Sequence, residues 1–102
     1  MYVRSKAEQI IDDWLYNNNI THAYERQVPI EENLCSDFYI KSANVWIEYW
    51  GLDEEKYNKR KEAKIQLYKK HKKNLIEITD KEIKQLDDFL PWELGKHGLD
   101  ID

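Results

Sequence analysis

The stretch SDFYIKSANVWIEYWG, residues 36–51, decides the fold of this chain. Its β-branched and aromatic side chains predict two strands, over residues 36–41 and 45–50. The small polar residues between them predict a tight turn, and Gly51 ends the second strand. Because so short a connection joins antiparallel strands, the other elements are arranged around this hairpin.

One helix and one strand are predicted before the hairpin. Ser5 and Glu8 have the spacing of a capping box, and apolar residues at helical spacing follow them. These features predict a helix over residues 5–18. Residues 24–30 predict a strand whose end is marked by Pro29.

A helix, a strand and a second helix are predicted after the hairpin. Asp53 can cap a long helix over residues 54–72, and residues 75–79 predict a fourth strand. A last helix follows, which Pro91 is expected to interrupt. Residues 92–102 are then expected to form a short amphipathic turn or helix and a loose tail.

The resulting order, α-β-β-β-α-β-α, predicts an α/β domain with a mixed four-stranded sheet flanked by helices. Three meandering strands come first, and the helix over residues 54–72 crosses over in a right-handed sense to a parallel fourth strand. This helix and the one over residues 5–18 should cover the two faces of the sheet. With 102 residues and no linker, the whole chain is expected to be one domain.

Composition excludes several classes of protein. No run of about 18 apolar residues is present, so no membrane span and no membrane partner are expected. The first residues lack the apolar core of a secretory signal, which favours the cytoplasm. The single cysteine, Cys35, forms no internal disulfide and no cysteine-based zinc site; we expect it to be a small packing residue.

Charge is distributed unevenly along the chain. The net charge is −4, but residues 56–73 hold nine basic groups and one acidic group, giving +8 against −12 for the other 84 residues. Such an asymmetry is typical of a face that binds polyanions. A lysine-rich helix exposed to solvent is the alternative interpretation.

Two acidic residues are predicted to face each other across the hairpin. With a two-residue connection at Ser42 and Ala43, Asp37 lies directly opposite Glu48 on the same face of the sheet. Like charges so placed destabilise a sheet unless a cation lies between them. A three-residue connection would instead place Asp37 opposite Tyr49, and both acids could also lie exposed or pair with lysines.

The surroundings of Glu48 favour a metal site. It lies within one of the most apolar runs of the chain, where an isolated carboxylate is costly. Two carboxylates with backbone carbonyls and water suit Mg²⁺ or Mn²⁺, the hard cations that act on phosphates.

A third candidate residue, Lys64, lies on the inward face of the predicted helix over residues 54–72. At 100° per residue it is near the middle of a stripe with Tyr57, Lys61, Ile65 and Tyr68. Its side chain either extends outward to solvent or reaches a buried anionic site near Glu48. The opposite, solvated face holds Lys59, Glu62, Lys69, Lys70 and Lys73.

These motifs together resemble the PD-(D/E)XK nuclease superfamily, whose members share the restriction-endonuclease-like fold. The resemblance covers about residues 3–79 and is strongest to small domains related to very-short-patch repair endonucleases and to nuclease modules appended to helicases. The residues that carry it are Val3-Arg4-Ser5-Lys6-Ala7-Glu8, Tyr24-Glu25, Ser36-Asp37-Phe38, Ile47-Glu48-Tyr49-Trp50-Gly51, Lys64 to Tyr68 and Leu75-Ile76-Glu77-Ile78-Thr79.

The resemblance implies a role for each candidate residue. Asp37, Glu48 and the backbone carbonyl of Tyr49 would bind Mg²⁺, and Glu8 would complete the site. Lys64 would bind the scissile phosphate or orient the attacking water. Arg60, Lys61, Lys69 and Lys72 would bind the nucleic-acid backbone.

Two positions depart from the family pattern. Ser36 replaces a proline, and Trp50 occupies the place of the motif lysine, so Lys64 would have to be a lysine that migrated to the next helix. Glu8 also has a purely structural explanation in the capping box.

The sequence therefore predicts a Mg²⁺-dependent endonuclease that hydrolyses DNA phosphodiesters. A catalytically inactive nucleic-acid-binding or assembly module on the same fold is the first alternative, favoured by Trp50. A protein-interaction domain is the second. The small size suggests a homodimer or fusion to a larger DNA-processing protein.

Overall fold

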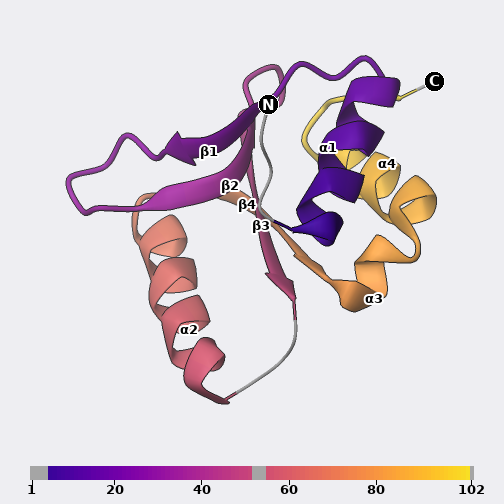
Figure 1. Ribbon diagram of the computed structural model, residues 1–102. Helices are drawn as coiled ribbons and strands as arrows, with labels where there is room; N and C mark the ends of the chain where they lie inside the picture. The colour runs from indigo at the N-terminus through magenta and orange to yellow at the C-terminus, as the bar shows by residue number, and fades with distance from the viewer. Residues whose placement is uncertain (1–4, 52–54, 102) are drawn as a thin grey trace.

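A computed structural model describes residues 5–51 and 55–101, with no side chains described at residues 55–58. The predicted cap Asp53, the motif residues Val3 and Arg4, and the side chain of Tyr57 lie outside this part of the chain. The elements (Figure 1) are α1 (Lys6–Asn17), β1 (Ala23–Gln27), β2 (Cys35–Ile40), β3 (Val45–Gly51), α2 (Glu55–Lys70), β4 (Asn74–Thr79), α3 (Asp80–Ile83) and α4 (Leu86–Lys96).

The strands form one mixed sheet in the order β1-β2-β3-β4. The β1–β2 and β2–β3 pairs are antiparallel, whereas β3 and β4 are parallel and connected through α2. The predicted α/β domain with a four-stranded mixed sheet flanked by helices is thus confirmed.

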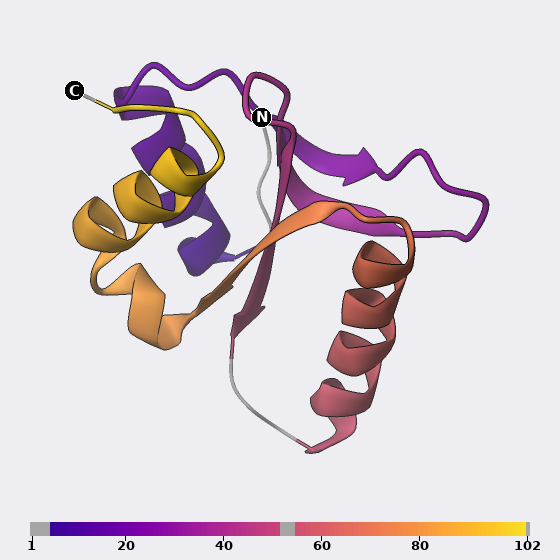
Figure 2. The ribbon, with the colours of Figure 1, turned by 180° about the vertical axis from the view of Figure 1, so that it is seen from behind.

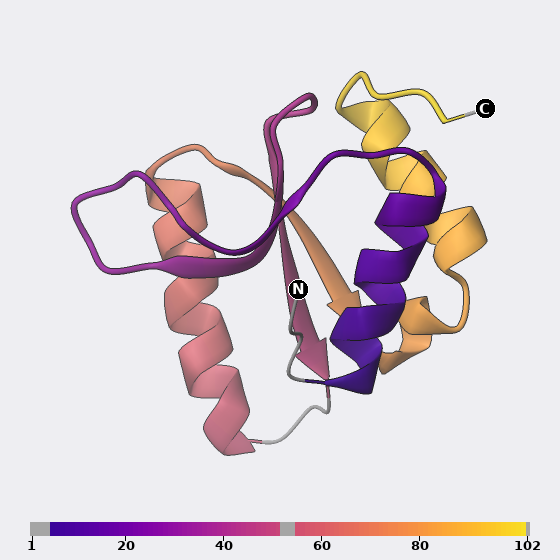
Figure 3. The same cartoon turned by 45° about the horizontal axis from the view of Figure 1, so that its top comes forward.

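Helices cover both faces of the sheet. In Figures 1, 2 and 3, α2 lies on one side of the sheet, and α1, α3 and α4 lie on the other. The predicted helices at residues 5–18 and 54–72 therefore do cover opposite faces. Because side chains alternate along a strand, each strand contributes to two different layers.

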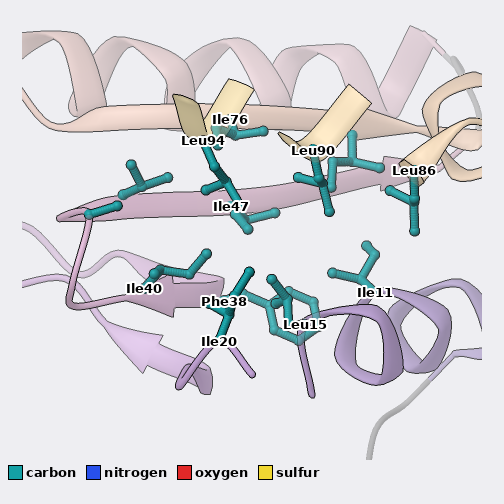
Figure 4. Close-up of a cluster of buried hydrophobic side chains, with 13 residues drawn as sticks. Ile11, Leu15, Ile20, Phe38, Ile40, Ile47, Ile76, Leu86, Leu90 and Leu94 are labelled. Atoms are coloured by element: carbon teal, nitrogen blue, oxygen red, sulfur yellow. The ribbon is translucent and has the colours of Figure 1, made fainter. Parts of the chain in front are cut away.

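The main hydrophobic core lies between the sheet and the helices α1 and α4 (Figure 4). Alternate strand residues such as Phe38, Ile47 and Ile76 point into it, and all three are at most 1% exposed. The helices contribute Ile11, Leu15, Leu86, Leu90 and Leu94.

The prediction that Pro91 interrupts the last helix was wrong. Pro91 lies inside α4, and the break falls earlier, between Ile83 and Leu86. Leu86, Leu90 and Leu94 recur every four residues and are all buried. Burying three leucines contributes roughly 1.5–3 kcal/mol each, which exceeds the cost of about 3 kcal/mol for a proline within a helix.

Two boundaries also differ from the prediction. The first strand ends at Gln27 rather than at residue 30. The Val28 N–H still bonds the Leu34 carbonyl oxygen at 2.8 Å, but the Ile30 N–H bonds the Val28 carbonyl oxygen at 2.8 Å in a local turn around Pro29. The C-terminal residues are not a loose tail as far as residue 101. Leu99 and Ile101 pack against the main core.

Candidate active site

The β2–β3 hairpin has the register that a two-residue connection predicts. Phe38 pairs with Ile47, and Ile40 pairs with Val45. The turn closes with a 3.1 Å hydrogen bond from the Asn44 N–H to the Lys41 carbonyl, and Asn44 adopts a left-handed φ of 52°. The paired residues end at Phe38 and Ile47, so the predicted position of Asp37 directly opposite Glu48 is not part of this ladder.

The carboxylates of Asp37 and Glu48 both belong to the face that α2 covers. Asp37 Oδ2 accepts a 2.8 Å hydrogen bond from the backbone N–H of Tyr49, the residue that follows Glu48. The same face carries Trp46, which packs in the cluster between the sheet and α2. The structure therefore brings together the two residues predicted to bind a metal.

Glu48 is almost completely buried, with 1% of its surface exposed. Its Oε2 lies 2.6 Å from Lys64 Nζ and accepts a 2.8 Å hydrogen bond from the hydroxyl of Tyr68. Burial, followed by the negative charge of Asp37, raises the pKa of Glu48 to about 7. Ionised Glu48 is thus disfavoured by two effects that a bound cation would oppose.

Lys64 reaches from α2 down to the sheet. Besides contacting Glu48, its ammonium donates a 3.0 Å hydrogen bond to the backbone carbonyl of Cys35 on β2. It also lies 5.7 Å from the centre of the Trp50 ring, within the range of a cation–π interaction. Of the two predicted positions for this side chain, the structure shows the one at the buried anionic site.

Trp50, which stands in place of the motif lysine, is 5% exposed and lies under α2. Lys61 and Lys64 each have their Nζ 5.7 Å from its ring centre. Its indole N–H donates a 3.0 Å hydrogen bond to Glu77 on β4. Two lysines of α2 therefore lie close to Trp50, and the migrated-lysine interpretation stays a prediction.

A groove of about 740 Å³ opens beside these residues. It is lined by the candidate residues Glu8, Asp37, Glu48, Tyr49, Arg60, Lys61 and Lys64. The predicted backbone-binding residues Lys69 and Lys72 are exposed and are not among the described residues that line it. The basic side chains at the groove are thus those in the middle of α2, residues 60–64.

Ser5 and Glu8 cap α1 as their spacing predicts, although the Glu8 carboxylate bonds the Ser5 hydroxyl and not the Ser5 backbone N–H of a full capping box. The Glu8 backbone N–H donates to Ser5 Oγ at 3.1 Å, and the Ser5 hydroxyl donates to Glu8 Oε1 at 3.0 Å. These bonds stabilise the start of α1, where an acidic side chain also complements the helix dipole. The role of Glu8 as a metal ligand stays a prediction.

The two carboxylates at the groove are compatible with Mg²⁺, because this ion needs few ligands from the protein. Among the residues that the structure describes, no three Asp, Glu, His or Cys side chains are grouped so that they could hold a metal ion. Mg²⁺ is usually bound through one or two carboxylates, with water and substrate phosphates completing the octahedron. Asp37 and Glu48 would be such a pair, and their role as metal ligands stays a prediction.

Three other residues at the site had no functional role assigned to them from the sequence. Tyr68 lies four residues after Lys64, one helical turn along the same face, and this spacing could have identified it. Glu25 and Cys35 line the groove from β1 and β2. Glu25 was part of the family resemblance only, and the place of both residues at the groove depends on how β1 pairs with β2.

The expectation that Cys35 is a packing residue was wrong. It is exposed and lines the groove. Partial desolvation and the nearby carboxylate of Glu25 raise the pKa of its thiol.

Comparison with protein-family models, with curated proteins and with solved structures gave no match for this chain. The resemblance to PD-(D/E)XK nucleases thus rests on the motif residues themselves. In the described parts of the chain, no helix is both long and apolar enough to span a membrane.

Proposed function

We propose that this domain is a Mg²⁺-dependent endonuclease of the restriction-endonuclease-like class that hydrolyses DNA phosphodiester bonds in the cytoplasm. One observation carries the proposal: a carboxylate pair on facing strands, Asp37 and Glu48, meets a lysine from the covering helix beside an open groove. A structural ion pair alone would not need the second carboxylate.

The residues divide the chemistry between them. Asp37, Glu48 and the Tyr49 carbonyl would hold Mg²⁺, with Glu8 as a further candidate ligand. When bound, the ion supplies Lewis-acid activation of water and charge stabilisation at the phosphate. Lys64 would hold the scissile phosphate or orient the attacking water.

The basic residues of α2 would bind the nucleic-acid backbone. Arg60 and Lys61 line the groove beside Lys64, whereas Lys69 and Lys72 would extend the contact outside it. Such contacts release counterions, so binding should weaken steeply with salt. One domain carries one site, so cutting both strands of a duplex would need a homodimer or a fused partner.

Plasmid nicking tests the proposal. We expect the wild-type protein to nick supercoiled DNA in the presence of Mg²⁺, and we expect the nicking to stop when EDTA removes the metal. Glu48→Gln and Asp37→Asn should each lower the rate by about a hundredfold or more. Glu62→Gln, on the exposed outer face of α2, is the matched control and should leave the rate unchanged.

An inactive nucleic-acid-binding or assembly module is the second candidate, and the buried Trp50 in the place of the motif lysine favours it. It predicts salt-dependent DNA binding with no Mg²⁺-dependent cleavage by any variant. Equal cleavage by wild type and Glu48→Gln would reveal a contaminating nuclease and remove the first proposal. A protein-interaction domain predicts no binding to DNA at all.

A further inference from the structure

Strand β4 forms one edge of the sheet. It pairs with β3 on one side, and no described strand pairs with it on the other. An edge strand presents a row of backbone N–H and C=O groups that can pair with another chain. The two edges of this sheet differ in how they limit such pairing.

The other edge strand, β1, has structural features that prevent another strand from pairing with it. Glu25, in the middle of β1, has a left-handed φ of 53°, which interrupts the regular strand. Glu25, Arg26 and Gln27 are all exposed on it. In contrast, β4 (Asn-Leu-Ile-Glu-Ile-Thr) contains no proline, no lysine and no residue with positive φ.

A hollow of about 320 Å³ lies along β4. Leu75, Ile76 and Glu77 line it from the strand, Lys61 lines it from α2, and Phe89 lines it from α4. Because α2 and α4 lie on opposite sides of the sheet (Figure 2), a hollow that both helices line must lie at the edge of β4. The space continues the plane of the sheet between two helices.

The charges around the hollow select the kind of strand that fits. Three acidic side chains, Glu77, Glu82 and Glu93, line it against one basic side chain, Lys61. Phe89 supplies an apolar contact on the α4 side. Pairing with β4 of a second copy would bring two acidic edges together, which disfavours self-association.

We propose that the β4 edge binds an extended segment of a partner protein in which basic and apolar residues alternate. The segment adds a fifth strand to the sheet, with its apolar side chains toward Phe89 and its basic side chains toward Glu77. Main-chain hydrogen bonds supply the affinity, and the two rows of side chains supply the specificity. This surface does not depend on the proposed nuclease activity.

The probe is an acetylated and amidated hexapeptide of alternating valine and lysine, added to the full chain and followed by NMR. We expect shifts at residues 74–79 and slower hydrogen exchange for alternate β4 amides. In the extended peptide the N–H groups of the valines point to one edge and those of the lysines to the other. A peptide N-methylated at every valine and one N-methylated at every lysine therefore each lose the N–H groups of one edge. One of these two peptides should bind about tenfold or more weakly, and the other should bind as the parent does.

Matched protein variants test the charge requirement. Glu77→Gln keeps an acceptor for the Trp50 indole but removes the charge, and it should weaken peptide binding several-fold. Asp88→Asn, on the exposed surface of α4, should leave it unchanged. Absence of binding at millimolar peptide, or equal binding of both N-methylated peptides, would overturn the proposal. A dimer that forms through β4 and excludes the peptide would assign the edge to a second copy and also overturn it.

Discussion

The two faces of the sheet bury different kinds of side chain. The face toward α1 and α4 buries aliphatic and aromatic side chains in one continuous core. The face toward α2 buries a smaller cluster that includes Tyr68 and Trp46, together with the carboxylate of Glu48. On that side Trp46 Nε1 is buried and has no hydrogen-bond partner among the described residues.

The difference indicates which face stabilises the fold and which can carry chemistry. Apolar burial contributes free energy without any requirement for partners, whereas each buried polar atom must be paired to avoid a penalty. The face under α2 tolerates Glu48 because Lys64 and Tyr68 both contact its Oε2. Substitutions on the two faces should therefore separate stability from function.

The largest effect on stability is expected at Phe38, and it is best measured against its neighbour on β2, Asp37, which points to the opposite face. Phe38→Ala should lower the free energy of unfolding by about 3–5 kcal/mol, because it leaves a cavity in the main core. Asp37→Asn keeps an acceptor for the Tyr49 N–H and should change it by less than about 1 kcal/mol. Urea denaturation at pH 7 measures both, and equal losses would contradict the assignment of stability to one face.

The second prediction concerns the pH dependence of stability without added metal. The pKa of Glu48 is raised from its ordinary value of 4.5 to about 7, so the folded state holds this proton more tightly than the unfolded state. The stabilisation is complete below pH 4.5 and is lost as pH rises through 7, by about 3 kcal/mol in total. Subtracting the unfolding free energy of the Glu48→Gln variant from that of wild type at each pH isolates this effect. A difference that does not change between pH 5 and pH 8 would show that Glu48 is not held in this way.

A smaller effect is expected for Lys64→Met. At pH 8 the substitution leaves the ionised Glu48 without its cation and should cost about 1–3 kcal/mol, less than for a fully buried pair because Lys64 is 31% exposed. The loss should shrink at pH 5, where Glu48 is protonated. Adding Glu48→Gln to Lys64→Met should restore most of the stability at pH 8. A double variant as unstable as Lys64→Met alone would show that Lys64 and Glu48 do not act as a unit.

The smallest effect is expected far from the groove. Glu32, in the β1–β2 connection, contacts Lys70 Nζ and His71 Nε2 at 2.6 Å each. The hydrogen bond from Lys70, together with that of His71, lowers the pKa of Glu32 to about 2. Its contribution is therefore present above pH 4.5 and is lost as pH falls toward 2.

Glu32→Gln should lower Tm by about 2 °C or less at pH 7, and the difference should vanish near pH 2. Glu31→Gln, at the exposed neighbouring position, is the control. Thermal scans monitored by circular dichroism at both pH values measure the shift. A difference between wild type and Glu32→Gln that persists at pH 2 would exclude the ion pair as its cause.

The register of the hairpin could be predicted from sequence because it depends on local chemistry. The small polar connection at Ser42 and Ala43 permits a tight turn, and period-two alternation then determines which side chains share a face. Helical spacing similarly placed Lys64 on the inward face of α2. These two periodicities predicted that Asp37, Glu48 and Lys64 lie near one another, and all three line the same groove.

Other features depended on tertiary contacts that no local pattern encodes. The contact of Lys64 with the Cys35 carbonyl requires the distance between α2 and β2, which spacing along the chain does not define. Pro91 was predicted to break a helix from its local preference, but the burial of leucines against the core outweighs that preference. Local rules thus failed where packing between distant segments decides the outcome.

The exposed thiol of Cys35 gives the groove a built-in reporter position. Because it is the single cysteine of the chain, a maleimide fluorophore or nitroxide would label one place without any engineered substitution. Its raised pKa means that labelling should be done at mildly alkaline pH, where enough thiolate is present. A label there would report on any ligand that enters the groove while leaving every candidate side chain intact.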